Sequence, residues 1–110
     1  MSAYPKGVQA MAVITHVLLR GVTKEQYDAV REACDWLADT PKGGHAHLTY
    51  FDGDECHSWD AWESEDAFAA FGETRLGPAM AKVGVEAVPE VAFFAAHEVF
   101  TPAVQRLTAT

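Results

Sequence analysis

The chain is 110 residues long and carries 16 acidic against 8 basic residues, which gives a formal net charge of −8. Hydrophobic residues make up 49% of it, too many for a disordered protein and enough for the core of one domain. An acidic surface repels phosphate backbones and anionic membrane surfaces, so we expect neither nucleic acid nor a membrane as a partner.

The first half of the chain predicts a strand, a helix and a second strand. Residues 11–20 (MAVITHVLLR) are rich in β-branched and apolar types, which is typical of a strand. Thr23 and Gln26 form a capping-box pattern, so a helix is predicted over about 24–38. Its apolar stripe consists of Tyr27, Val30, Cys34 and Leu37. Residues 45–51 alternate between polar and apolar types and predict the second strand.

The second half of the chain predicts a strand, a helix and a strand again. Asp52-Gly53-Asp54 is a hairpin signal, and the third strand follows over 55–62. Ser64 is a good N-cap for the second helix. Gly77-Pro78 is expected to break this helix, which then restarts with Pro78 in its first turn. The fourth strand is predicted over 91–100.

The order β-α-β-β-α-β predicts the fold class: an α+β, ferredoxin-like domain. Right-handed crossovers fold both halves onto one four-stranded antiparallel sheet, with two helices on one face and the strand order 4-1-3-2. We expect the domain to span residues 11–100, with a flexible N-terminal tail over 1–10 and a C-terminal tail over 101–110.

Both faces of the predicted sheet are apolar. In the first strand Ala12, Ile14 and Leu18 share one face, while Val13, Val17 and Leu19 share the other. The fourth strand is apolar on both sides in the same way. Two helices cover only one face of a four-stranded sheet, so we expect a second copy of the chain to cover the other. The predicted assembly is a homodimer, a dimeric α/β barrel with an enclosed interior.

Five histidines lie in or beside the predicted strands: His16, His45, His47, His57 and His97. Neutral imidazoles near a carboxylate carry protons near pH 7, or hold a transition metal. The candidate catalytic residues are His16, His47 and Asp60. Burial beside Trp59 and Trp62 would make the Asp60 carboxylate a stronger base. The alternative for each histidine is a satisfied core or surface position. The alternative for Asp60 is an ion pair or hydrogen bond to the opposite strand.

Aromatic residues supply candidate walls for a binding site. The candidate substrate-binding residues are Trp62, Phe71, Phe93 and His97, with plain core packing as the alternative for the aromatic ones. Trp36 is expected at the outer edge of the first helix or in a dimer contact. Cys34 lies on the buried stripe. The acidic neighbours of Cys56 would raise its pKa, which makes it a poor nucleophile.

Several known site types are absent from the sequence. It has no G-x-G-x-x-G, Walker, G-x-S-x-G or H-E-x-x-H motif, so we expect no nucleotide cofactor. The first ten residues contain no apolar h-region of a secretory signal, and two cysteines are too few for a disulfide scaffold. The expected location is therefore the cytoplasm.

Four segments resemble a known family: GVTKEQYD (21–28), DAWESEDAFAAF (60–71), RLGPAMAKVGV (75–85) and PEV (89–91). They are similar to the dimeric α/β-barrel proteins related to the antibiotic-biosynthesis monooxygenase domain, especially small actinobacterial members. The resemblance spans about 11–100 and implies a ferredoxin-like protomer, a homodimer and an interior cavity. It also implies a polar, cavity-facing group at His16. The haem-degrading branch carries a histidine ten residues after an aromatic; here Ala81 follows Phe71 at that distance, which argues against haem degradation.

Three hypotheses for function follow. The first is a metal-free, cofactor-independent monooxygenase, cyclase or isomerase that acts on a hydrophobic or aromatic small molecule by His/Asp acid–base chemistry. The second is a non-catalytic ligand-binding or stress-associated dimer whose interior is filled by side chains. The third is a metal-binding protein that uses the strand histidines. An open cavity of about 300 Å³ or more would favour the enzyme.

Overall fold

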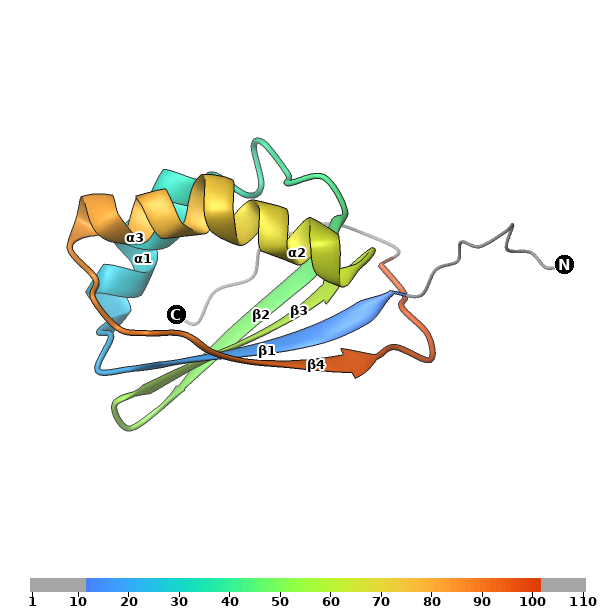
Figure 1. Ribbon diagram of the computed structural model, residues 1–110. Coiled ribbons are helices and arrows are strands. Elements are labelled where there is room, and N and C mark those ends of the chain that lie inside the picture. The colour runs from blue at the N-terminus through green and yellow to red at the C-terminus, as the bar shows by residue number, and fades with distance from the viewer. Residues whose placement is uncertain (1–11, 102–110) are drawn as a thin grey trace, which may run out of the picture.

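The structure, a computed structural model, describes residues 12–101. Its helices lie together on one face of a single four-stranded sheet, as Figure 1 shows. The predicted tails over 1–10 and 101–110 lie outside the described residues, apart from Thr101, and so does Met11. The predicted ferredoxin-like, α+β fold is confirmed.

The sheet has the predicted strand order, β2-β3-β1-β4, with all neighbours antiparallel. The strands are β1 (Val13–Arg20), β2 (Gly44–Asp52), β3 (Glu55–Trp62) and β4 (Glu90–Ala95). The hairpin between β2 and β3 has the two-residue connection that Asp-Gly predicts. Gly53 adopts φ +62°, a value that only glycine reaches at low cost.

Helix α1 (Lys24–Cys34) begins at the predicted capping box. The backbone N–H of Gln26 donates to Thr23 Oγ1 at 3.1 Å, and the Gln26 side chain accepts from the Thr23 N–H at 3.0 Å. The predicted end near residue 38 was wrong. Asp35 takes the left-handed conformation with φ 54°, and the Arg75 guanidinium binds the carbonyl oxygens of Cys34 and Asp35. This bond satisfies carbonyls that a longer helix would have bonded internally.

The early end of α1 directs Trp36 into the core. Its ring centroid lies 5.2 Å from that of Trp62 and 5.6 Å from that of Phe71. The expectation that Trp36 lies at the outer edge of the helix or in a dimer contact was therefore wrong. The turn at Asp35 points this side chain at the sheet.

The second helical segment runs without a break from Glu65 to Val83, so the predicted interruption at Gly77-Pro78 was wrong. It comprises α2 (Glu65–Phe71), a π-helical turn (Gly72–Leu76) and α3 (Gly77–Val83). The N–H of Gly77 donates to the carbonyl of Gly72, five residues earlier, and this wide turn accommodates Pro78 in the first turn of α3. None of the helices within residues 12–101 has the length and apolar character needed to cross a membrane.

Strand β4 is shorter than predicted, since it begins at Glu90 and ends at Ala95, whereas the prediction was 91–100. Val13 at the start of β1 pairs with Ala95, and Ala96 N–H donates to Ala12 O at 3.0 Å. The neighbouring strand is β1, and Ala12 is the first described residue before it. The chain from Ala96 onward leaves the sheet, and His97 lies beyond it.

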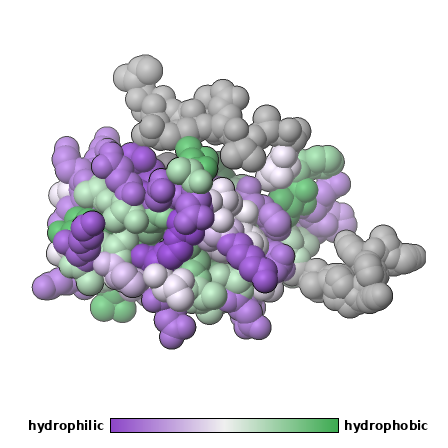
Figure 2. All heavy atoms as spheres, turned by 90° about the horizontal axis from the view of Figure 1, so that it is seen from above, coloured by the Kyte–Doolittle hydropathy of each residue, from purple (hydrophilic) through white to green (hydrophobic). Residues whose placement is uncertain are grey.

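The two faces of the sheet differ in cover. The helix side holds the core, which includes Cys34, Trp62 and Met80, and the outer surface of the helices is mainly hydrophilic (Figure 2). The other side, called the back face below, presents exposed apolar side chains in this single chain. Leu48 is 64% exposed and Phe94 50% exposed. The apolar back face predicted from sequence is thus present.

Candidate functional site

A row of four residues crosses the sheet beneath the helices. In the strand register His47 pairs with Asp60, Asp60 with Thr15, and Thr15 with Phe93. Residues opposite one another in neighbouring strands point to the same face. This row lies on the helix side, because His47 contacts α1 and the Phe93 ring lies 5.6 Å from that of Phe68 in α2.

A line of hydrogen bonds connects the sheet to α1 at one end of this row. Asp60 Oδ1 lies 2.7 Å from His47 Nδ1, and His47 Nε2 lies 2.6 Å from the hydroxyl of Tyr27. The second carboxylate oxygen of Asp60 accepts from Trp62 Nε1 at 3.1 Å. Asp60 is only 6% exposed and Trp62 is fully buried. A buried carboxylate is therefore fixed in place by two ring N–H groups.

The partners of His47 decide which of its nitrogens carries the proton. A carboxylate only accepts hydrogen bonds, so Nδ1 carries the proton that it donates to Asp60. In the neutral ring Nε2 then holds a lone pair, which accepts from Tyr27 or from Thr49 Oγ1 at 2.9 Å. A base oriented in this way by a buried carboxylate is the arrangement of an activated general base.

Hydroxyl groups surround the basic nitrogen. Thr49 Oγ1 lies 3.1 Å from the Tyr27 hydroxyl and 2.9 Å from Ser58 Oγ. Burial raises the pKa of Tyr27 above its ordinary value, against the opposing effect of its hydrogen bond with Thr49. Tyr27 therefore keeps its proton at neutral pH and acts as a donor to His47.

A cavity lies between the sheet and the helices beside this line of hydrogen bonds. Its volume is about 80 Å³, and its polar wall includes Tyr27, His47, Ser58 and Asp60. Its apolar wall includes Trp36, Phe68, Phe71 and Met80. The volume is below the roughly 300–1,000 Å³ of drug-sized ligand sites. The space fits a molecule of one small ring unless the aromatic wall moves.

Four of the residues predicted from sequence lie together at this site: His47, Asp60, Trp62 and Phe71. The alternative for Asp60, a hydrogen bond with the neighbouring strand, is also present, since its carboxylate accepts from His47 Nδ1. Phe93 lies on the same face of the sheet, farther along the row. His16 does not join them, because its position in β1 places it on the back face, and His97 lies beyond β4.

Sequence reasoning missed Tyr27, Thr49 and Trp36 as site residues. Tyr27 was assigned to the apolar stripe of the first helix, which fixed its face but not the direction of its hydroxyl. Thr49 lies two residues after His47 in the same strand, and side chains two residues apart in a strand point to the same face, so this spacing was a usable signal. Trp36 depended on the turn at Asp35, which no pattern predicted.

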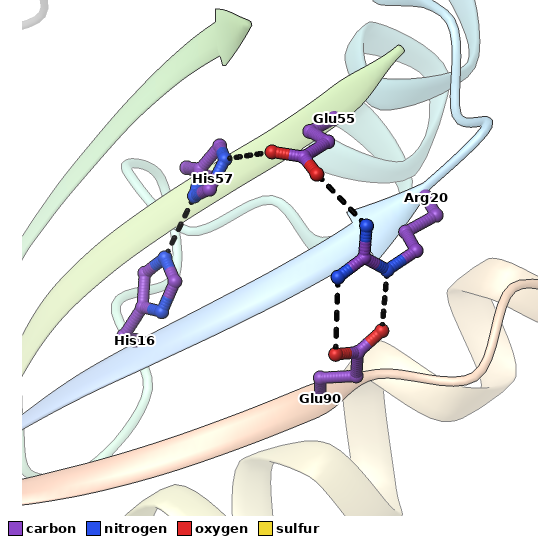
Figure 3. A network of polar contacts seen from close by, with 5 residues as sticks. All are labelled: His16, Arg20, Glu55, His57 and Glu90. Carbon is purple, nitrogen blue, oxygen red and sulfur yellow. Dashed lines mark hydrogen bonds and ion pairs between the residues drawn. The ribbon is translucent and has the colours of Figure 1, made fainter.

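A second polar network occupies the back face (Figure 3). His16 Nε2 lies 2.9 Å from His57 Nδ1, and His57 Nε2 lies 2.9 Å from Glu55 Oε1. Arg20 forms two ion pairs, one with Glu55 at 2.8 Å and one with Glu90 at 2.7 Å. The hydrogen bond from His57 and the charge of Arg20 hold the pKa of Glu55 below its usual range. The network links β1, β3 and β4.

The two cysteines lie at the edge of the site: Cys34 lines the cavity, and the Cys56 thiol interacts with the side chain of Ser58. Cys34 is buried, as predicted, and Cys56 is 1% exposed. The pKa of Cys56 is raised, but burial rather than the neighbouring acids is the cause. Within residues 12–101 no group of three or more His, Cys, Asp or Glu side chains is placed to hold a metal ion.

Comparison with known proteins identifies likeness in structure but not in sequence. No protein-family model and no curated protein matches the sequence significantly. A protein of unknown function from Nitrosomonas europaea superposes with a TM-score of 0.65 and 18% identity, covering 86% of this chain and 97% of that one.

Two further solved structures have described activities. The cofactor-independent oxygenase SnoaB from Streptomyces nogalater gives a TM-score of 0.60 at 14% identity, covering 86% of this chain and all, 100%, of that one. A monooxygenase from Streptomyces coelicolor in complex with nanaomycin D gives 0.56 at 16% identity, covering 84% and 94% of the two chains. The chain thus has the ferredoxin-like fold of antibiotic-biosynthesis-monooxygenase-like proteins, and the resemblance read from its sequence is confirmed at the level of fold.

Proposed function

We propose that this chain, which has the fold of antibiotic-biosynthesis-monooxygenase-like proteins, binds a small aromatic molecule beneath its helices and removes a proton from it. The observation that carries the proposal is the hydrogen-bonded line from buried Asp60 through His47 to Tyr27. It has the parts that proton abstraction requires: an oriented base, a carboxylate that stabilises the resulting imidazolium, and a hydroxyl at the cavity wall.

The proton moves in two coupled steps. A phenolic or enolic hydroxyl of the ligand donates to the oxygen of Tyr27, while Tyr27 passes its own proton to the lone pair on His47 Nε2. The ligand is left as an anion, and the positive charge on His47 is balanced by Asp60. Formation of such an anion is the first step shared by oxygenation with O₂, cyclisation and isomerisation.

Oxygenation is the reaction we favour among these three. Two proteins with this fold are a cofactor-independent oxygenase and a monooxygenase. An electron-rich carbanion reacts with O₂ to give a hydroperoxide, which loses water: R₂CH₂ and O₂ become R₂C=O and H₂O. The residues that we assign supply only the proton transfer, and O₂ supplies the oxidant.

Oxygen uptake with phloroglucinol, a one-ring phenol whose keto form carries acidic CH₂ groups, tests the proposal. General acid–base groups contribute about 10²–10⁴-fold to rate, so we expect His47→Gln to lower kcat/KM at least about 100-fold. The control is His45→Gln, which changes an exposed histidine two residues away on the same strand. Equal rates in the two variants would exclude His47 as the base.

The small cavity favours a second candidate, a non-catalytic binding protein. A volume of about 80 Å³ leaves little room for a large aromatic substrate. If this candidate is correct, phenol quenches the fluorescence of buried Trp62, while no oxygen is consumed with phloroglucinol. Binding without turnover in the wild type would support this candidate over the enzyme.

We further infer that the back face binds a second copy of the chain. Large apolar side chains are exposed there, and a patch of this kind on one side of a sheet marks an interaction surface. They include Leu48, Tyr50 and Phe94. A second copy presents the same patch, so a two-fold axis would bury all of these residues at once.

Sedimentation velocity at pH 7.5 tests the homodimer. We expect the wild type to sediment as a dimer and Phe94→Glu to sediment as a folded monomer, because a buried charge at the interface is unpaired. Glu73→Gln, an exposed change on the helix side, is the control and should remain dimeric. A wild type that is monomeric at micromolar concentrations contradicts the inference.

A further inference from the structure

A pair of histidines lies at the centre of the back face. The two rings face each other at 2.9 Å between His16 Nε2 and His57 Nδ1, and each is also stacked on an aromatic ring. The His16 ring lies 4.3 Å from that of Trp59, and the His57 ring 4.7 Å from that of Tyr50. The pair therefore lies within the surface that the proposed dimer covers.

The hydrogen bonds of this pair fix its protons. Glu55 only accepts, so His57 carries a proton on Nε2, and in the neutral ring its Nδ1 is a lone pair. His16 Nε2–H then donates to that lone pair. One added proton is tolerated, because it resides on His57, which bonds to the carboxylate of Glu55 and can donate to His16 instead (Figure 3).

A second added proton has no place in this geometry. The two facing nitrogens are 2.9 Å apart, and each would then carry a hydrogen that points at the other. Two positively charged rings would also lie in contact. The rings must then separate, and among residues 12–101 no carboxylate is hydrogen-bonded to His16. Among the described residues, the charged and titratable groups near the pair are Glu55 on β3, Arg20 on β1, Glu90 on β4 and Tyr50 on β2. Both carboxylates are already bonded to Arg20.

We propose that the His16–His57 pair is a pH-sensitive switch in the back-face interface, which holds two copies together at neutral pH and releases them when His16 is protonated. The proposal rests on the homodimer proposed above. A charged imidazole without a partner is costly in an interface that excludes water, while in the separated protomer it is solvated. Histidine titrates in the range where such switches operate.

The release follows from proton linkage. Each protomer takes up one proton when the interface opens, and a dimer therefore takes up two. Uptake of two protons raises the dissociation constant by up to about 100-fold for each unit by which the pH falls. Acid therefore shifts the equilibrium from the dimer, in which His16 is neutral, to the monomer, in which it is charged.

Sedimentation of the wild type, His16→Gln and His97→Gln at pH 7.5 and 5.5 tests the switch. Glutamine keeps a donor near the position of Nε2 but does not titrate. We expect the dissociation constants of the wild type and of His97→Gln to be at least about 10-fold higher at pH 5.5 than at pH 7.5. The dissociation constant of His16→Gln should be the same at both pH values. Circular dichroism at pH 5.5 should show a folded monomer. If His16→Gln does not fold, His16→Asn, which also removes the titrating group, replaces it with the same expectation.

The outcomes separate this switch from the dimer itself. A wild type that is equally dimeric at both pH values overturns the switch and leaves the dimer standing. Equal weakening of the wild type and His16→Gln also overturns the switch, as does acid unfolding of the wild type at pH 5.5. A wild type that is monomeric at both pH values contradicts the dimer, and the switch falls with it.

Discussion

At the scale of single residues, Thr15 has an unusual environment. It is fully buried in the central strand β1, and its hydroxyl has no hydrogen-bond partner among the described residues. Burying a hydroxyl without a partner costs about 1–3 kcal/mol, and most buried polar groups in native proteins are paired. Thr15 also lies directly opposite Asp60 in the site row.

Removing this hydroxyl should stabilise the fold. Thr15→Val keeps the shape of the side chain and removes the unpaired group, so we expect the free energy of unfolding in urea to rise by about 1 kcal/mol. Thr15→Ser, the matched control, keeps the hydroxyl and loses a methyl group, and it should be less stable than the wild type. A Thr15→Val protein that is destabilised would show that the hydroxyl has a partner such as a buried water.

Tyr27 predicts a distinct response to alkali. Burial raises its pKa in the folded chain, so above about pH 10 the unfolded chain ionises first and stability falls until the folded pKa is passed. Below that range both states keep the proton and nothing is lost. We expect Tyr27→Phe to lose less unfolding free energy than the wild type between pH 9 and 11, as urea titrations would measure. Parallel curves for the two proteins would contradict this assignment.

Residue-level prediction succeeded where the side-chain type dictated the environment. Asp60 among aromatic residues was a usable signal, because a carboxylate there needs a partner, and His47 provides it. His16 lies on the back face, apart from His47 and Asp60, because neighbouring residues along a strand point to opposite faces and Thr15 takes the helix side. The hydroxyl of Tyr27 could not be assigned from an apolar helical stripe.

At the scale of elements, the loop before β2 packs closely against the start of α2. Gly43 has φ +83°, and a Cβ atom added there would lie 2.7 Å from Cβ of Ala67. The carbonyl of Gly43 also accepts from the N–H of Glu63 at 2.7 Å. This contact places the strand that carries His47 relative to the helices above the site.

Two glycine substitutions separate strain from steric clash. Gly53→Ala has a positive φ but open space around it, so we expect a loss of about 1 kcal/mol in unfolding free energy from strain alone. Gly43→Ala adds the clash with Ala67, and we expect a loss of at least about 2 kcal/mol. Equal losses in thermal or urea unfolding would show that the loop relaxes away from the helix.

Element types and their order were predictable because hydrophobic periodicity and capping residues are local signals. The boundaries that failed depend on tertiary contacts. Helix α1 ends where Arg75, distant in the sequence, bonds its last carbonyl groups. Strand β4 ends where the described residues of its partner strand end. Neither condition is visible in the segment that it limits.

At the scale of the whole molecule, charge opposes the proposed assembly. Each copy carries a formal net charge of −8, so two copies repel one another while the apolar back faces attract. Salt screens such repulsion over about 10 Å at 0.1 M. The balance between these two effects, unlike the fold, cannot be derived from the pattern of one chain.

Raising the salt concentration should therefore strengthen the dimer. Between 20 and 300 mM NaCl at pH 7.5 we expect the dissociation constant from sedimentation to fall by several-fold, because the long-range repulsion is screened and the apolar contact is not. The Glu73→Gln variant, with one negative charge fewer, should show a slightly smaller salt effect. A dimer that weakens in salt would instead depend on ion pairs across its interface.

The wide turn at Gly72–Leu76 has a geometric consequence for the helix that contains it. Phe71 and Met80 are nine residues apart, which in an uninterrupted α-helix places them about 180° apart around the axis. Both are buried against the same core. A π turn acts as one inserted residue, and it reduces that angle to about 80°. Deleting a single residue from the turn would therefore leave a regular α-helix with Met80 still facing the core, whereas inserting one would rotate Met80 outward, so this segment tolerates the loss of one residue better than the gain of one.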